Sequence, residues 1–253
     1  MTGTLTGVAL AAAVLILSHV GLSSPGLRGW LVARLGRPAF LALHSAVALA
    51  TLAWLVVAYR AAPQVELWPA APWTYLVPLA LMPLAAVLLV AGMTTANATV
   101  TSDGKLPAGA DPAPGILKVT RHPVMWAIIL WAASHLPPNG DAASLIFFGT
   151  PTALALAGTA LLDAKHAKTQ GEAFARFAAV TSSVPLAATL RGRNRVRLSE
   201  IGLWKLAAGL ALYAVFVLTH EFVIGTSPPP SCPRRLGGAG LVGGATSVPS
   251  WRA

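Results

Sequence analysis

The sequence predicts an all-α integral membrane protein, a polytopic bundle of about six transmembrane helices. Of its 253 residues, 55% are hydrophobic and only 10% are charged, and the mean hydropathy of +0.67 is far above that of a soluble domain. The apolar residues also gather in runs of roughly 18 to 25, the length with which an α-helix crosses about 30 Å of hydrocarbon.

Six apolar runs are expected to form these helices, and they cover residues 4–22, 39–61, 73–93, 119–137, 142–162 and 201–224. The first run lacks the basic start and the small-residue cleavage site of a secretory signal, so it is expected to stay as a helix. The fourth is the weakest, because Arg121 and His122 lie at its start. Pro123 suits a first helical turn, and Pro-Pro-Asn-Gly at 137–140 forms a turn before the fifth helix.

Lys and Arg are unevenly distributed over the connections between these runs. Four lie on one side of the predicted bundle, at Arg60, Arg234, Arg235 and Arg252. The other side holds fourteen: Arg28, Arg34, Arg37, Lys105, Lys118, Arg121, Lys165, Lys168, Arg176, Arg191, Arg193, Arg195, Arg197 and Lys205. Because cytoplasmic connections are enriched in these residues, both termini are predicted on the periplasmic side of a bacterial inner membrane. This orientation explains the formal net charge of +10, so no nucleic-acid partner is expected.

Residues 1–225 are expected to form one transmembrane domain, followed by a Pro- and Gly-rich tail at 226–253 that is expected to be disordered. Cys232, in this tail, is the single cysteine. A disulfide within the chain and a cysteine-based metal site are therefore excluded. A bound metal would have to be held by histidine.

Four of the six histidines are expected in or at the ends of transmembrane helices, namely His19, His44, His122 and His135. Ionisable groups at membrane depth are costly and tend to be functional. Imidazole is a usual axial ligand of haem iron, so a bis-histidine haem b is chemically available. For His19 and His44, a hydrogen bond to a neighbouring helix is an equally good explanation. His122 and His135 cannot bind one iron together, because 13 residues of helix separate them by about 20 Å.

The remaining ionisable groups have structural explanations. His166 lies in a charged segment and is expected to be solvated, and His220 beside Glu221 is expected at an interface. For Arg121 and His122, anchoring at the level of the lipid phosphates and capping of polar groups is the alternative to a functional role. The nearest acidic residues on that face have local partners available: Asp163 and Glu172 are expected to pair with Lys165, Lys168 or Arg176.

Four motifs together resemble the NnrU family. They are Ser-His-Val-Gly-Leu-Ser at 18–23, Leu-His-Ser at 43–45, Gly-Ile-Leu-Lys-Val-Thr-Arg-His-Pro at 115–123 and Trp-Ala-Ala-Ser-His-Leu at 131–136. The resemblance covers about residues 4–190 and implies a bacterial membrane protein associated with nitrite and nitric oxide metabolism. A relative of this family, the 15-cis-zeta-carotene isomerase, uses a histidine-ligated haem b to isomerise a polyene. Its ligands would fall on His19 and His135.

The predicted topology disagrees with that pair. His19 lies near the cytoplasmic end of its helix and His135 near the opposite end of another, so their depths differ by about 20 Å. By depth alone, any two of His19, His44 and His122 make a better pair of iron ligands. All four histidines stay candidate haem ligands, with Arg121 as a further candidate cofactor-binding residue.

A second and partial similarity is to the isoprenylcysteine carboxyl methyltransferase family. It rests on Arg-His-Pro at 121–123, Gly-Glu-Ala-Phe-Ala-Arg-Phe at 171–177 and Val-Pro at 184–185. It implies a membrane-embedded site for S-adenosylmethionine. That family has a pair of glutamates before the glycine and tyrosines after it, where this chain has Asp163 and phenylalanines, which puts cofactor binding in doubt.

Three classes of function are open. The first is a haem-binding isomerase or redox protein that acts on a lipophilic small molecule such as a polyene. The second is an S-adenosylmethionine-dependent membrane methyltransferase, and the third a non-catalytic partner of a nitrite or nitric oxide reductase. No phosphate loop, nucleophile elbow or acid–base constellation in the sequence decides between them.

Overall fold

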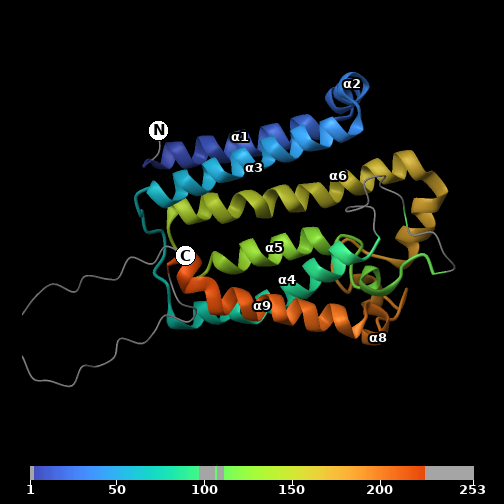
Figure 1. Cartoon of the computed structure of the whole chain (residues 1–253). Helices are drawn as coiled ribbons and strands as arrows, with labels where there is room; N and C mark the ends of the chain where they lie inside the picture. The colour runs from blue at the N-terminus through green and yellow to red at the C-terminus, as the bar shows by residue number, and fades with distance from the viewer. Residues whose placement is uncertain (1–2, 97–105, 107–110, 226–253) are drawn as a thin grey trace, which may run out of the picture. The chain divides into compact units, whose positions relative to one another are not determined.

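The computed structural model describes residues 3–96, 106 and 111–225, and over these residues the chain is all-α, as predicted (Figure 1). The expected tail at 226–253 lies outside the described residues. The first half contains α1 (Leu5–Ser23), α2 (Pro25–Leu35), α3 (Arg37–Ala61), the 3₁₀-helix η1 (Pro72–Tyr75) and α4 (Leu76–Thr94). The second half contains the 3₁₀-helix η2 (Gly115–Lys118), α5 (Pro123–His135), α6 (Ala142–Val180), α7 (Ala187–Leu190), α8 (Leu198–Ile201) and α9 (Leu203–Ile224).

Among the described residues, five helical stretches are long and apolar enough to cross a membrane: α1, α3, Pro72–Thr94 (η1 with α4), α6 and α9. They correspond to five of the six predicted spans, and they fit contact with a lipid bilayer. The fourth predicted span, residues 119–137, is wrong in length. Its helix α5 has 13 residues, which rise about 20 Å and fall short of the roughly 30 Å of hydrocarbon.

The residues before α5 are not helical because they bond to another segment. The backbone N–H of Arg121 donates to the carbonyl of Ser182 at 3.0 Å, and that of Leu186 donates to the carbonyl of Val119 at 2.7 Å. His122 has φ −123° and ψ 56° and stands at the N-cap of α5. Helix formation therefore starts only at Pro123, whose missing N–H suits the first turn.

The chain divides into two compact units. Unit 1 comprises Met1–Ala70 with Gly140–Gly158, and unit 2 comprises Ala71–Asn139 with Thr159–Ala253. In unit 1, α1 packs against α3 through buried small and aliphatic side chains that include Val8, Ala11 and Leu55. Small residues let helix backbones approach closely, which is a usual source of stability between helices in lipid.

The start of α6 in unit 1 is tied to the connection that follows α3. Leu67 and Trp68 both donate their backbone N–H to the carbonyl of Gly140, at 2.7 and 3.1 Å. Asp141 caps the helix, because its Oδ1 accepts from the backbone N–H of Ser144 at 3.1 Å. The Ser144 hydroxyl lies 2.9 Å from the Tyr59 hydroxyl of α3, so this helix start is anchored at several points.

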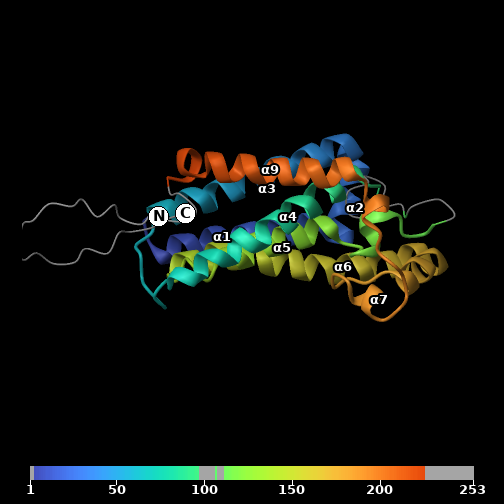
Figure 2. The ribbon, with the colours of Figure 1, turned by 90° about the horizontal axis from the view of Figure 1, so that it is seen from below.

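In unit 2, α4 packs against both α5 and α9, and the ribbons lie side by side in both views (Figures 1 and 2). Gly209 of α9 permits one close approach, since a Cβ there would stand 2.6 Å from Cα of Val87 in α4. The rest of α9 is open: Leu218 and Phe222 are 82% and 94% exposed. Such side chains are suited to contact with lipid.

Helix α6 is longer than the predicted span of 142–162. It runs for 39 residues to Val180, with a kink at Gly171 where φ is 45°. The residues after 162 include Ala, Lys, Gln, Glu and Arg, which favour helix, and they bury His166, Phe174 and Phe177. From Ala142 to Asp163 the helix rises about 31 Å. Asp163 therefore lies about one hydrocarbon thickness from the apolar start of the helix.

Candidate functional site

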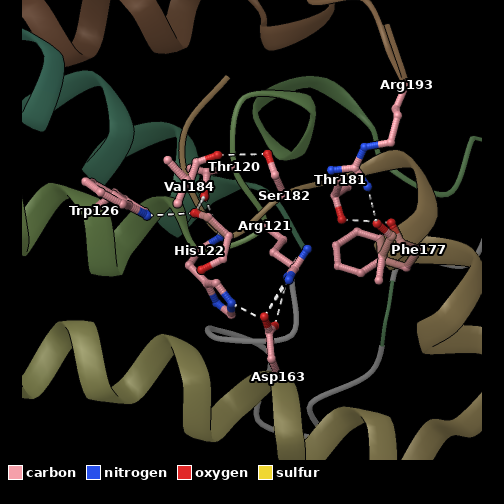
Figure 3. A network of polar contacts seen from close by, with 12 residues as sticks. Thr120, Arg121, His122, Trp126, Asp163, Phe177, Thr181, Ser182, Val184 and Arg193 are labelled. Carbon is pink, nitrogen blue, oxygen red and sulfur yellow. Dashed lines mark hydrogen bonds and ion pairs between the residues drawn. The ribbon is translucent and has the colours of Figure 1, made fainter. Parts of the chain in front are cut away.

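Asp163 is the centre of a compact ionic cluster in unit 2 (Figure 3). Arg121 Nε donates to both carboxylate oxygens, at 2.8 and 3.0 Å, and its Nη2 donates to Oδ2 at 2.5 Å. His122 Nε2 lies 2.9 Å from Oδ1 of the same carboxylate. We call Arg121, His122 and Asp163 the Arg–His–Asp cluster. The sequence-predicted pairing of Asp163 with Lys165, Lys168 or Arg176 is replaced by these contacts with the start of α5.

The segment at 182–186 positions the cluster from outside. The carbonyl of Ser183 accepts from the Thr120 hydroxyl and from Trp126 Nε1, both at 2.7 Å. The backbone N–H of His122 donates to the Thr120 hydroxyl at 3.2 Å. Trp126 lies in the first turn of α5. These hydrogen bonds therefore hold the start of α5 and orient the side chains of Arg121 and His122.

His122 is the most buried member of the cluster, with 3% of its side chain exposed. Its Nδ1 is buried and has no hydrogen-bond partner among the described residues. A carboxylate on one imidazole nitrogen orients the ring and leaves the other nitrogen for a metal or a proton. His122 therefore has the arrangement of a metal-ligating or proton-accepting histidine.

Aromatic residues of α6 complete the surroundings. The guanidinium carbon of Arg121 lies 5.9 Å from the centre of the Phe174 ring, within the range of a cation–π contact. The His166 ring lies 6.1 Å from Phe174, and Gln170 Nε2 is 2.7 Å from its Nδ1. The prediction that His166 is solvated is wrong, because only 2% of it is exposed. The helix continues past residue 162 and turns His166 inward.

His19 and His44 come together in unit 1, from α1 and α3. Their ring centres lie 4.9 Å apart in an edge-to-face contact with an interplanar angle of 62°. Phe40 lies 6.0 Å from His44, whose Nδ1 is buried without a hydrogen-bond partner among the described residues. A bis-histidine haem needs a flat porphyrin between its two imidazoles. Rings in direct contact leave no room for one, so this pair does not fit a shared haem.

His135 ends α5 in unit 2. Its Nδ1 donates to the carbonyl of Trp131 at 2.6 Å, and it interacts electrostatically with His220 of α9. His135 and His122 stand at opposite ends of one helix, as predicted from their spacing. The ligand pair that the isomerase resemblance implies, His19 with His135, joins residues of two separate units and stays a prediction.

No group of three or more His, Cys, Asp or Glu side chains that could hold a metal ion occurs within the described ranges. The segment 171–177, which is part of the similarity to the methyltransferase family, turns its charged side chains outward. Glu172 and Arg176 pair with each other at 3.7 Å, with side chains 95% and 72% exposed. Glu172 therefore has the local partner that was expected of it, and its carboxylate faces solvent.

The comparison with known protein families supports the first resemblance and extends it. The profile of the NnrU protein family matches residues 8–228. The match thus includes α9, beyond the 4–190 covered by the resemblance. A search of curated proteins and a search of solved structures found no match. The matched region spans most of the chain and contains every described histidine, so the chain belongs to the NnrU protein family and is a multi-pass, all-α member of it.

Proposed function

We propose that this protein acts in nitrite and nitric oxide metabolism in the bacterial inner membrane, and that the Arg–His–Asp cluster is its working site. The resemblance to the NnrU family supports the association with nitrogen oxides. The observation that carries the choice of site is the buried His122, which Asp163 holds through one nitrogen while the other has no partner among the described residues. Burial of an ionisable group is costly, so such groups are usually kept because they have a function.

The side chains of the cluster have separable roles in this proposal. Asp163 orients the imidazole and favours its Nε2–H tautomer, so Nδ1 presents a lone pair. Arg121 holds the carboxylate through three hydrogen bonds. Phe174 gives the Arg121 guanidinium an aromatic neighbour on one side. The cluster thus keeps one imidazole nitrogen ready to accept a proton or bind a metal.

Haem b is the cofactor that we propose for this site. The chemistry of His122 suits one axial ligand, while the direct contact of the His19 and His44 rings speaks against those two as a shared pair. His135 is not the second ligand, because it stands about 20 Å from His122 at the other end of α5. Haem would supply an iron centre for electron transfer or for isomerisation of a lipophilic molecule. His122, Asp163 and Arg121 would bind and orient that centre.

The ultraviolet-visible spectrum of protein purified in mild detergent tests the cofactor. We expect a Soret band, with sharp α and β bands after reduction by dithionite. The band should be lost in His122→Ala and kept in His135→Ala, because His135 stands at the other end of α5 and cannot bind the same iron. His220→Ala is the matched control, because His220 also lies in a transmembrane helix and is not a proposed ligand, and it should keep the band.

Two outcomes contradict the cofactor proposal. One is the absence of haem absorbance in folded protein produced with ample haem, and the other is an unchanged band in His122→Ala. Heat on titration with S-adenosylmethionine would then favour the methyltransferase alternative. Copurification with a nitrite or nitric oxide reductase, without binding of either cofactor, would favour a non-catalytic partner.

The predicted orientation, with both termini periplasmic, has a direct test in the single cysteine of the chain. Cys232 follows α9, so a membrane-impermeant maleimide should label it in intact spheroplasts. Cys232→Ala should not be labelled, and disruption of the spheroplasts should not increase labelling of the wild-type protein. Labelling only after disruption would place this end of the chain in the cytoplasm and reverse the orientation.

A further inference from the structure

A pocket of about 370 Å³ lies in unit 2, apart from the Arg–His–Asp cluster, where the connection between α6 and α9 passes η2. Its lining combines four basic side chains with two carboxylates: Lys118, Arg193, Arg195, Arg197, Asp111 and Glu200. The basic charges exceed the acidic ones by two. The pocket therefore favours an anionic ligand. Such a ligand needs basic groups that are not already paired with carboxylates or carbonyls of the protein.

Two of the four basic groups are engaged by the protein. Lys118 Nζ lies 2.5 Å from Glu200 and 2.9 Å from Asp111. The hydrogen bond to Glu200, followed by the one to Asp111, raises the pKa of Lys118 above its ordinary value, so this ammonium stays charged and paired. Arg193 Nη1 donates to the carbonyls of Ala178 and Ala179, at 3.0 and 3.1 Å, and thereby caps the end of α6.

Arg195 and Arg197 are the other two basic residues of the pocket. Arg195 is exposed and makes no ion pair or hydrogen bond to another described residue. Arg197 has one weak contact, with its Nε 3.9 Å from a Glu200 oxygen. Both carboxylates of the pocket are already taken by Lys118. Two guanidinium groups thus face the pocket without a strong partner.

The backbone presents these two arginines on one face. Along Arg-Asn-Arg-Val-Arg at 193–197 the arginines are exposed while the residues between them are half-buried, the alternation of an extended chain. Asn194 Nδ2 donates to the carbonyls of Lys118 and Val180, at 3.0 and 2.7 Å. Val196 packs against the core of unit 2. The inward residues hold the segment, so the outward guanidinium groups have a defined direction.

The pocket also lies close to the start of α9, a helix long and apolar enough to cross a membrane. Helix α9 starts at Leu203, and Glu200 in the pocket wall is only three residues earlier, which is within about 10 Å. The first turn of α9 carries an exposed Trp204 with Lys205 Nζ 5.7 Å from its ring, a pairing typical of the membrane interface. Leu190 and Leu198, on either side of the arginine segment, are 85% and 63% exposed.

We propose that this pocket binds the phosphate of an anionic phospholipid, with Arg195 and Arg197 as its ligands. Arginine binds phosphate through two parallel N–H donors, and basic groups beside a transmembrane helix attract anionic lipids. The exposed Leu198 and Trp204 lie against the acyl chain. These apolar neighbours favour a lipid over a soluble phosphate, because a soluble anion would leave them in water.

Lipid titration of delipidated protein in a neutral detergent, followed by native mass spectrometry, tests the proposal. Wild-type protein should bind phosphatidylglycerol, and the double variant Arg195→Gln with Arg197→Gln should bind it about 30-fold more weakly, the effect of two basic groups near an anionic surface. Arg195→Lys with Arg197→Lys should keep most of the binding. Arg176→Gln is the matched control, an exposed arginine of α6 outside the pocket.

Phosphatidylcholine with the same acyl chains and inorganic phosphate complete the design. Neither should bind with the affinity of phosphatidylglycerol. Equal affinity of the double variant and the wild-type protein for phosphatidylglycerol would overturn the proposal. So would equal binding of phosphatidylcholine, because the charge of the lipid would then not matter. Inorganic phosphate that binds as tightly as the lipid would assign the pocket to a soluble anion instead. Unchanged circular dichroism of the variants shows that they are folded.

Discussion

Asp163→Asn is expected to lower the free energy of unfolding by about 3 kcal/mol, the effect of removing one partner from a buried ion pair. The substitution keeps the shape of the side chain but removes its charge. Arg121 and His122 would then share a neutral amide, although their side chains are only 15% and 3% exposed. We place the effect at the lower end of the range because 21% of the Asp163 side chain is exposed.

Equilibrium unfolding in mixed micelles, followed by circular dichroism, measures this change. Glu172→Gln is the matched control, because Glu172 is also an acidic residue of α6 with an arginine partner, but its side chain is 95% exposed. Exposed pairs add little to stability, so the control should unfold almost as the wild-type protein does. If the two variants were equally stable, the cluster would contribute no more than a surface ion pair.

Gly140→Ala is expected to destabilise unit 1 by about 3 kcal/mol, the upper part of the range for overpacking. The new Cβ would lie 1.9 Å from the carbonyl oxygen of Trp68. That oxygen belongs to the backbone and cannot turn away like a flexible side chain. The two segments cannot separate either without loss of the hydrogen bonds from Leu67 and Trp68 to the Gly140 carbonyl. The same unfolding experiment measures the change.

The control for this substitution is Gly149→Ala, nine residues further along the chain in α6. No atom lies within 4 Å of a Cβ at Gly149. Alanine is also the better helix former by about 0.5 to 1 kcal/mol. This variant should therefore be as stable as the wild-type protein or slightly more stable. If Gly140→Ala were as stable as the wild-type protein, the connection after α3 would be able to move away from the new Cβ at little cost. That connection would then not anchor α6.

The sequence predicts α1, α3, α4 and α9 to within a few residues, because a long apolar run in lipid has to satisfy its own backbone hydrogen bonds. The two errors in the predicted spans both concern helix ends. Residues 119–122 belong to the fourth predicted span, but their backbone bonds to 182–186, more than 60 residues away. The charged residues after 162 end the apolar run, but they favour helix, and the burial of His166, Phe174 and Phe177 adds to the stability of this part of α6.

Arg121 and His122 of the candidate site are recognisable from the sequence, because they fall within the predicted span 119–137 and ionisable groups at membrane depth are costly. Asp163 is not assigned correctly, since three basic residues on the same helix offer closer partners in sequence than Arg121 and His122, which lie 42 and 41 positions away. The position of Asp163 directly after an apolar run is a signal for its role. His166 carries no such signal in the sequence.

The sequence by itself therefore determined the class of the protein, most of its membrane-spanning helices and the family to which it belongs, because these depend on hydrophobic length and on local motifs. Tertiary structure alone decided which charges meet. It joined Asp163 to the start of α5, brought His19 against His44, and left Arg195 and Arg197 exposed while Lys118 took both nearby carboxylates. Hydrogen bonds and ion pairs act over a few ångströms in space, and a sequence does not show which distant residues come that close.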